Sequence, residues 1–326
     1  MNSPLVRITQ KGLYCEAGDF FIDPSGPVSK AVITHGHGDH ARKGSRKYLT
    51  TQTGEAILRA RLGDVSLQTL PYQETLRIGD VALSFHPAGH ILGSSQIRIE
   101  HRGEVWVVSG DYKLAKDKTC APFEPVPCHT FLTESTFANP RYVFPETKVV
   151  IHQIEDWWRE NQASEKTSVL FAYALGKAQR ILSEIDHSLG PIWIHPDIEK
   201  MNKAYEKTGV FLPKTNIFSS TVNLPKRSLV LIPPVRASAK LLRNAGAISK
   251  GFTSGWAQTT QEHHRQTMDR GFILSDHADW NELQTAIFST GATQIYTSHG
   301  SADYLADFLT EQGLCASVFG SEKPQE

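Results

Sequence analysis

Short apolar runs alternate with amphipathic stretches along most of the chain. Runs rich in β-branched residues predict strands, and apolar residues spaced three and four apart predict helices that bury one face. Strands are expected at 31–34, 105–109, 130–133, 169–172, 192–195, 229–232, 272–274 and 294–297. Helices are expected at 150–158, 181–189, 283–287 and 305–309, and glycines follow the last three as helix-end signals. This alternation is typical of an α/β protein.

Several predicted strands lead directly into a histidine or an acidic residue. The residues in question are His35, Asp111, Glu134, His277 and His299. Sites in α/β proteins are usually built where rigid strands end and loops begin. We therefore expect these side chains to converge on one site.

The segment ITHGHGDH at 33–40 concentrates groups that bind metal ions. Imidazole and carboxylate together suit zinc or a similar ion. In an extended segment His35 and His37 point the same way and can share one ion. The glycines permit a tight turn that can carry Asp39 and His40 towards a neighbouring ion. A histidine-rich polar loop is the alternative, but the preceding strand and the further candidates along the chain favour a metal segment.

A two-metal site needs more ligands than this segment offers. Candidates are His90 in PAGH, Asp111 in SGDY and His299 in TSHG. Each is a weak signal alone, because a His or Asp after a strand often does no more than bond a turn. A carboxylate can give one oxygen to each of two ions, and we expect Asp111 to be this shared ligand.

Composition narrows the class of protein. The formal net charge is zero, which argues against a polybasic protein but leaves room for a local basic groove. The N-terminus has no secretion-signal pattern, and no apolar run approaches the roughly 18 residues of a membrane span. The four cysteines are scattered without a CxxC pair, which favours reduced thiols. We expect a cytoplasmic protein without membrane contact.

At this point the motifs resemble a known family. THGHGDH, PAGH, SGDY and TSHG, in this order, resemble the metal motifs of the metallo-β-lactamase superfamily. TEST around Glu134 and SDHAD around His277 resemble the additional motifs of its β-CASP nuclease branch, and 168–185 is similar to a strand–helix segment of that branch. The opening LVRITQKGLYCEAGDFFIDP is most similar to the bacterial ligase-associated DNA exonuclease group. The resemblance covers nearly the whole chain.

The resemblance implies a fold. It is a four-layer αββα metallo-β-lactamase sandwich with an inserted, compact β-CASP-like α/β cap domain. The metallo-β-lactamase domain would be discontinuous, at 1–137 and 272–326, and the cap would occupy 138–271. This cap is shorter than in many relatives of the branch, which argues against a long substrate tunnel.

The resemblance also implies a ligand set for two divalent ions, with zinc favoured and manganese accepted by the same ligands. The first ion would be held by His35, His37 and His90, the second by Asp39, His40 and His299, and Asp111 would bridge them. Asp23 in FIDP would organise the ligands, although a plain turn before Pro24 is the alternative. Asp279 would orient His277 or a ligand.

The implied reaction is hydrolysis of a phosphodiester. A hydroxide that bridges the two ions would attack phosphorus. Glu134 and His277 would help to protonate the leaving sugar oxygen, and Asp39 is grouped with them as catalytic. A simple lactamase does not need such a pair, so the pair favours a phosphodiesterase.

Basic residues follow two of the metal motifs and could contact phosphates at the mouth of the site. They are Arg42, Lys43, Arg46 and Lys47 after the first motif and Lys113 after Asp111. The alternative is a solvated charged face.

The leading hypothesis is a DNA exonuclease in DNA repair that prefers DNA over RNA. The resemblance also implies a functional association with an ATP-dependent DNA ligase and a helicase. His299 keeps a second hypothesis open, because a histidine at this motif is commoner among RNA-processing members, which act on RNA 3′ ends. A small-molecule thioester or lactam hydrolase is a third hypothesis. A metal-stabilised scaffold is the fourth.

Overall fold

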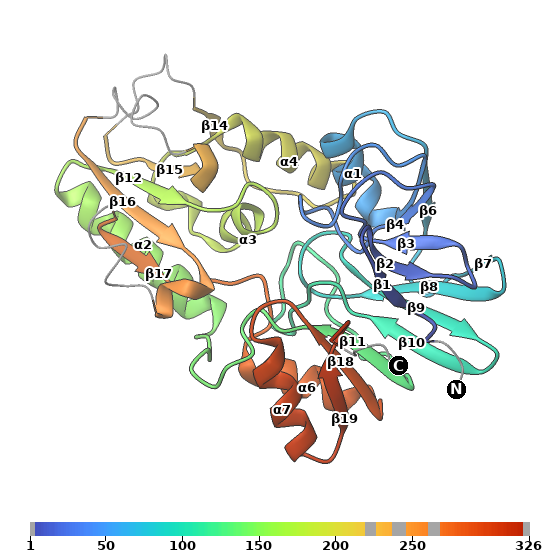
Figure 1. The fold of residues 1–326 in the computed structure, drawn as a ribbon. Coiled ribbons are helices and arrows are strands. Elements are labelled where there is room, and N and C mark those ends of the chain that lie inside the picture. The colour runs from blue at the N-terminus through green and yellow to red at the C-terminus, as the bar shows by residue number, and fades with distance from the viewer. Residues whose placement is uncertain (1–3, 219–225, 237–245, 260–267, 322–326) are drawn as a thin grey trace. The chain divides into compact units, whose positions relative to one another are not determined.

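The computed structural model describes residues 4–218, 226–236, 246–259 and 268–321. The chain divides into two compact units (Figure 1). The first unit combines Met1–Val143 with His277–Glu326, and the second is Phe144–Asp276. The first unit is therefore discontinuous in sequence, and each unit is described here by itself.

The first sheet of the first unit has six strands in sequence order. They are β1 (Arg7–Thr9), β2 (Gly12–Cys15), β3 (Phe20–Ile22), β4 (Lys30–Val32), β5 (Lys47–Thr51) and β6 (Leu67–Leu70). The first three strands pair antiparallel, and β3 to β6 pair parallel. The parallel half contains β4, the strand that leads into the 33–40 segment.

The second sheet of the first unit has seven strands in the order β19-β18-β11-β10-β9-β8-β7. Their bounds are β7 (Thr75–Ile78), β8 (Val81–Pro87), β9 (Ser95–His101), β10 (Glu104–Val108), β11 (Thr130–Glu134), β18 (Gln294–Ser298) and β19 (Cys315–Val318). The strands β10, β11, β18 and β19 pair parallel. Because parallel strands end at the same edge of a sheet, the residues after β10, β11 and β18 meet there.

Apolar side chains of the two sheets meet in one core. Val32 and Leu49 of the first sheet and Phe85 and Ile97 of the second belong to the same buried cluster. The outer face of each sheet is covered by helix. The covering elements are η1 (Gln52–Gly54) and α1 (Glu55–Leu62) beside the first sheet, and α6 (Trp280–Ser289) and α7 (Ala302–Glu311) on the second. Burial of these helix faces against strands fixes the ends of the strands as a rigid rim.

The second unit is built on a six-stranded sheet in the order β14-β13-β15-β12-β16-β17, and all its strands pair parallel. The strands are β12 (Thr167–Phe171), β13 (Ile192–Ile194), β14 (Asn216–Ile217), β15 (Leu229–Ile232), β16 (Ile248–Thr253) and β17 (Arg270–Phe272). The helices are α2 (Thr147–Ala163), α3 (Lys177–Glu184) and α4 (Pro196–Glu206), with short η2 (His187–Leu189), η3 (Pro234–Arg236) and η4 (Gly255–Gln258). The central strands β12 and β15 are buried throughout, as parallel strands covered on both faces should be.

The sequence did not predict helices α1 and α4 or strands β1 to β3, β5 to β9, β14, β16 and β19. Two of the expected elements also have different bounds. The helix expected at 181–189 ends at Glu184, because Ile185 is extended and the Asp186 carboxylate accepts the Ser188 amide to start a separate turn. The strand expected at 272–274 lies at Arg270–Phe272, where it pairs with β16 of the second unit. The second unit therefore ends a few residues later than the inserted segment expected at 138–271.

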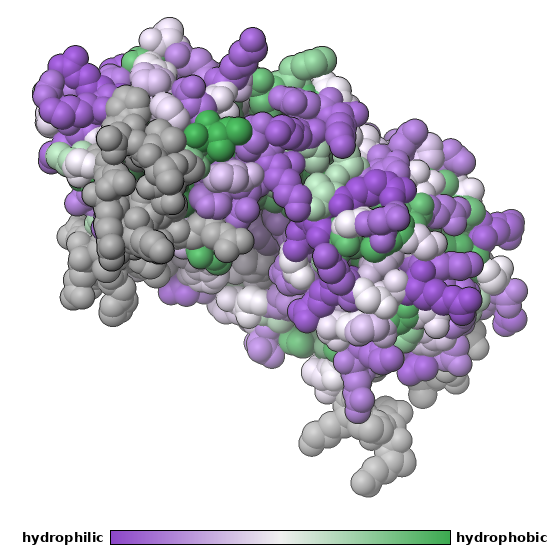
Figure 2. Space-filling model, turned by 90° about the horizontal axis from the view of Figure 1, so that it is seen from above, coloured by the Kyte–Doolittle hydropathy of each residue, from purple (hydrophilic) through white to green (hydrophobic). Residues whose placement is uncertain are grey.

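Polar side chains dominate the face shown in Figure 2, and the hydrophobic residues on that face form small separate groups. Among the described helices, none combines the length and the apolar character needed to cross a membrane.

Candidate metal centre

The turn after β4 presents the histidines of the 33–40 segment. His35 is buried and His37 is partly buried. The Ala41 amide donates to the His37 carbonyl at 2.8 Å and so closes the turn. Arg61 of α1 donates to the Gly36 carbonyl and holds the turn from the helix side. The local fold therefore keeps both imidazoles on one side of a tight loop.

Other strands deliver the remaining side chains to the same rim. His90 lies in the loop between β8 and β9, Asp111 follows β10, and Glu134 is the last residue of β11. Glu134 is paired in register with Ser298, so His299 leaves β18 at the same edge. Gly110, just before Asp111, has a φ of +58°, and a Cβ there would meet Thr34 at 2.8 Å. The chain can turn Asp111 towards the histidines only because this position has no side chain.

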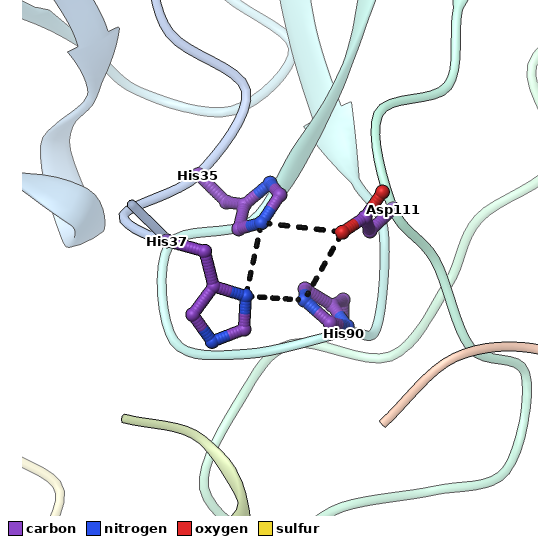
Figure 3. A group of neighbouring side chains, drawn as sticks. All are labelled: His35, His37, His90 and Asp111. Atoms are coloured by element: carbon purple, nitrogen blue, oxygen red, sulfur yellow. Dashed lines mark hydrogen bonds and ion pairs between the residues drawn. The ribbon is translucent and has the colours of Figure 1, made fainter. Parts of the chain in front are cut away.

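Three imidazoles and one carboxylate form a compact cluster (Figure 3). The ring nitrogens and carboxylate oxygen of His35, His37, His90 and Asp111 lie within 4.8 Å of one another. His37 Nδ1 lies 3.1 Å from His35 Nε2 and 3.0 Å from His90 Nε2. Nitrogen and oxygen donors that converge in this way suit a zinc-like divalent ion.

Asp111 is the central residue of the site. Its Oδ2 lies 3.4 Å from His40 Nε2, 3.5 Å from His35 Nε2, 3.8 Å from His90 Nε2 and 3.9 Å from His277 Nε2. Burial alone would raise the pKa of Asp111, but His40 and His277 hold that pKa well below its usual value. Burial, together with the charge of His40, lowers the pKa of His35 well below its usual value. A neutral imidazole beside an ionised carboxylate is the state that binds a cation.

Asp23 holds His40 in place. Its Oδ2 accepts from His40 Nδ1 at 2.7 Å, and its other oxygen accepts the Thr34 amide at 2.8 Å. The Thr34 hydroxyl also donates to Asp23. Burial alone would lower the pKa of His40, but Asp111 and Asp23 raise it well above the usual value. With Nδ1 committed to Asp23, the Nε2 atom of His40 is the one that faces Asp111.

Glu134 and His277 form a second pair at the rim. His277 Nδ1 donates to Glu134 Oε2 at 2.8 Å. Glu134 also accepts the Tyr112 amide at 2.8 Å and the Thr136 hydroxyl at 2.5 Å. The Glu134 side chain is 3% exposed, whereas that of His277 is 27% exposed. A buried carboxylate thus orients an imidazole whose other nitrogen lies 3.9 Å from Asp111 Oδ2.

The side chains expected on a second ion are arranged more openly. Asp39 is 74% exposed, with Oδ2 3.7 Å from His40 Nε2, and His299 is exposed. Both residues line a cavity of about 310 Å³ that Asp23, His40, Asp111 and Glu134 also line. The structure thus brings Asp39, His40 and His299 to one cavity without gathering them as tightly as the first cluster.

The remaining candidates from the sequence are Asp279 and the basic residues. Asp279 is the N-cap of α6, where its carboxylate accepts the Asn281 and Glu282 amides. His277 Nδ1 bonds Glu134. Lys113 does not reach the mouth of the site, because it is 5% exposed and pairs with Glu282 at 3.1 Å. The remaining basic candidates, Arg42, Lys43, Arg46 and Lys47, are exposed.

Sequence reasoning missed three residues that support the site. Thr34 bonds Asp23, Thr136 bonds Glu134, and Arg61 bonds the loop of the first histidines. Thr34 and Thr136 lie within two residues of candidate site residues, so their place in the chain was a usable signal. Arg61 lies on a helix far along the sequence, where its charge looks like an ordinary surface feature.

Sequence comparison finds relatives among nucleic-acid enzymes. The chain is 31% identical over 320 residues to a probable DNA ligase of Opitutus terrae, a match that covers 97% of this chain and 31% of that protein. It is 24% identical over 184 residues to an RNase J-like protein of Methanocaldococcus jannaschii, which covers 49% of this chain and 44% of that protein. The matches span less than half the length of either relative. No protein-family model matches the chain.

The His35–His37–His90–Asp111 cluster is compatible with a divalent-metal site. Comparison of structures finds a protein of unknown function from Enterococcus faecalis V583, with a TM-score of 0.60 and 12% identity over 85% of this chain and 76% of that one. At this identity the likeness concerns the fold alone.

Proposed function

We propose that the protein is a metal-dependent phosphodiesterase that acts as a DNA exonuclease in DNA repair. The observation that carries the proposal is the hydrogen bond between Glu134 and His277 beside Asp111. Hydrolysis of an amide-like ring needs no such pair. Cleavage of a phosphodiester releases a sugar oxygen, which leaves easily only when it receives a proton.

The donor chemistry of the site fits two divalent ions, for which we favour zinc. His35, His37 and His90 would hold one, Asp39, His40 and His299 the other, and Asp111 would touch both. When bound, the ions would supply an activated water and positive charge for the phosphate. Asp111 Oδ2 faces His35 and His90 of the first set and His40 of the second, which supports its shared place.

The chain's own part in the reaction centres on one proton. Glu134 accepts the Nδ1 proton of His277 and so fixes the ring, and the Tyr112 amide and Thr136 hydroxyl fix Glu134. His277 Nε2, 3.9 Å from Asp111 Oδ2, would then carry a proton to the leaving oxygen. Because the Glu134 side chain is only 3% exposed, its bond to the ring is shielded from solvent.

The fold supports the same assignment. We assign the two facing sheets and their covering helices to the αββα sandwich of the metallo-β-lactamases. We assign Phe144–Asp276 to the inserted β-CASP-like cap. The exposed side chains of Arg42, Lys43, Arg46 and Lys47 would contact phosphates of the substrate.

The choice of DNA as substrate rests on the relative that matches almost the whole chain. That relative is named a probable DNA ligase and extends well beyond the match. A nuclease and a ligase that act on the same DNA ends would account for the match between this chain and part of a protein named as a ligase. A helicase would act on the same DNA. RNA processing is the second candidate, because another relative is named RNase J-like.

The test is cleavage of end-labelled DNA and RNA strands of matched sequence, each labelled at one end or the other, with zinc or manganese. The Asp111→Asn variant is the control. We expect mononucleotide release from DNA that disappears in the variant. Cleavage confined to RNA would transfer the protein to RNA processing, and no cleavage of either strand, with hydrolysis of a chromogenic lactam or thioester instead, would overturn the nuclease proposal.

A further inference from the structure

Lys113 is a buried lysine with a defined place beside the site. Its ammonium donates to Glu282 Oε2 at 3.1 Å and to the His277 carbonyl at 3.3 Å. The side chains of Lys113 and Glu282 are 6% and 17% exposed. A charged pair so far from solvent has lost most of its hydration, which its mutual attraction need not repay. Apolar residues of similar size would often be at least as stable there, so stability alone does not account for the pair.

Glu282 connects the loop after Asp111 to the start of α6. Its Oε1 accepts the Ala115 amide at 2.6 Å, and its Oε2 accepts the Asp279 amide at 3.1 Å. The latter bond is half of the capping box that begins α6 immediately after His277 and Ala278. One carboxylate therefore fixes both the loop that carries Asp111 and the helix start that carries His277.

The backbone of Lys113 reaches a third segment. Its amide donates to the Ala88 carbonyl at 3.0 Å, two residues before His90. Gly89 has a φ of +73°, and a Cβ there would lie 2.1 Å from the Lys113 carbonyl oxygen. The loop of His90 therefore packs directly on this lysine, which a side chain at position 89 would prevent.

We propose that Lys113 and Glu282 are positioning residues that fix the ring of His277 between Glu134 and Asp111. The proposal rests on the proposed function for its catalytic consequence, since the ring would protonate the leaving group. The ammonium contacts the main-chain oxygen of His277 rather than its ring. The pair therefore sets where the backbone of residue 277 lies, and Glu134 sets how the ring is turned.

The test compares three variants of the full chain loaded with zinc. Lys113→Met removes the ammonium, and Lys113→Met combined with Glu282→Gln also removes the negative charge that would be left without a cation and would impair folding. Lys30→Met is the matched control, because Lys30 pairs with Asp19 at 3.0 Å but is far more exposed. Each variant is measured for zinc content, for kcat and KM on a DNA strand, and for the imidazole N–H signals of ¹⁵N-labelled histidines, with that of His277 assigned from its absence in His277→Ala.

We expect both Lys113 variants to lose or shift the signal of the His277 Nδ1 proton and to lower kcat by about 10- to 100-fold. KM, the zinc content of Lys113→Met and the control variant should stay at the parent values. An unchanged proton signal together with an unchanged kcat in the folded double variant would overturn the positioning role. If the parent itself cleaves no strand, the proposed function fails instead, and the proton signal alone decides the positioning role.

Discussion

The two halves of the candidate metal centre differ in how completely the chain builds them. In the first half, His35, His37, His90 and Asp111 already lie within 4.8 Å of one another and are buried or partly buried. In the second half, Asp39 is 74% exposed and His299 lies on an open cavity. The first half is held by strand ends and packed loops, whereas in the second His40 is held by Asp23 but Asp39 and His299 are exposed.

The difference follows from where each ligand sits on the fold. His35 lies three residues after the end of β4, and Asp111 lies three residues after β10, in the middle of the second sheet. Asp39 projects from the tip of a turn, and His299 has a left-handed φ of +64° after the last residue of β18. A preformed group of ligands loses little conformational entropy on binding an ion, and an open group must be ordered by the ion itself. We therefore expect the first half to bind its ion more tightly.

The largest effect should come from Asp111→Asn, because Asp111 is the residue that the two halves share. An amide carries no charge and cannot offer two equivalent oxygens, so both ions should bind poorly and cleavage should fall more than about 100-fold. Metal analysis of the purified variant checks this. Two fully occupied sites would refute the shared place, and loss of one ion alone would assign Asp111 to a single half.

His277→Ala should have a large effect on rate without an effect on metal. The ring is held by Glu134 and is proposed to give a proton rather than to bind an ion, so metal content should stay at the parent level. Loss of a general acid typically costs about 10²- to 10⁴-fold. The loss should be greatest for an unactivated phosphodiester and small for one with a nitrophenolate leaving group. A parent-like rate on the unactivated substrate would contradict the proton-donor role.

The sequence predicted the strand ends of the site well, because a strand followed by a histidine or acid is a local pattern. The distance between Asp111 and His277 could not be predicted in the same way, because those residues are far apart along the chain and only the fold brings them together. Lys113 shows the limit: a lysine after a metal motif looks like a phosphate contact, and only the fold reveals Glu282 beside it. The short strands β1 to β3 were missed, because residues of mixed burial give no clear alternation.

The smallest effect should come from His299→Ala, and this variant tests the difference between the two halves of the metal centre most directly. Because His299 belongs to the open half, its loss should weaken the second ion by about tenfold or more and leave the first in place. We expect one tightly held ion per chain after dialysis against a weak chelator, and cleavage that recovers when excess zinc or manganese is added. His277→Ala should not recover under the same treatment, which separates a ligand from a proton donor. If His299→Ala instead lost both ions, the two halves would be a single cooperative site, and their different exposure would carry no functional meaning.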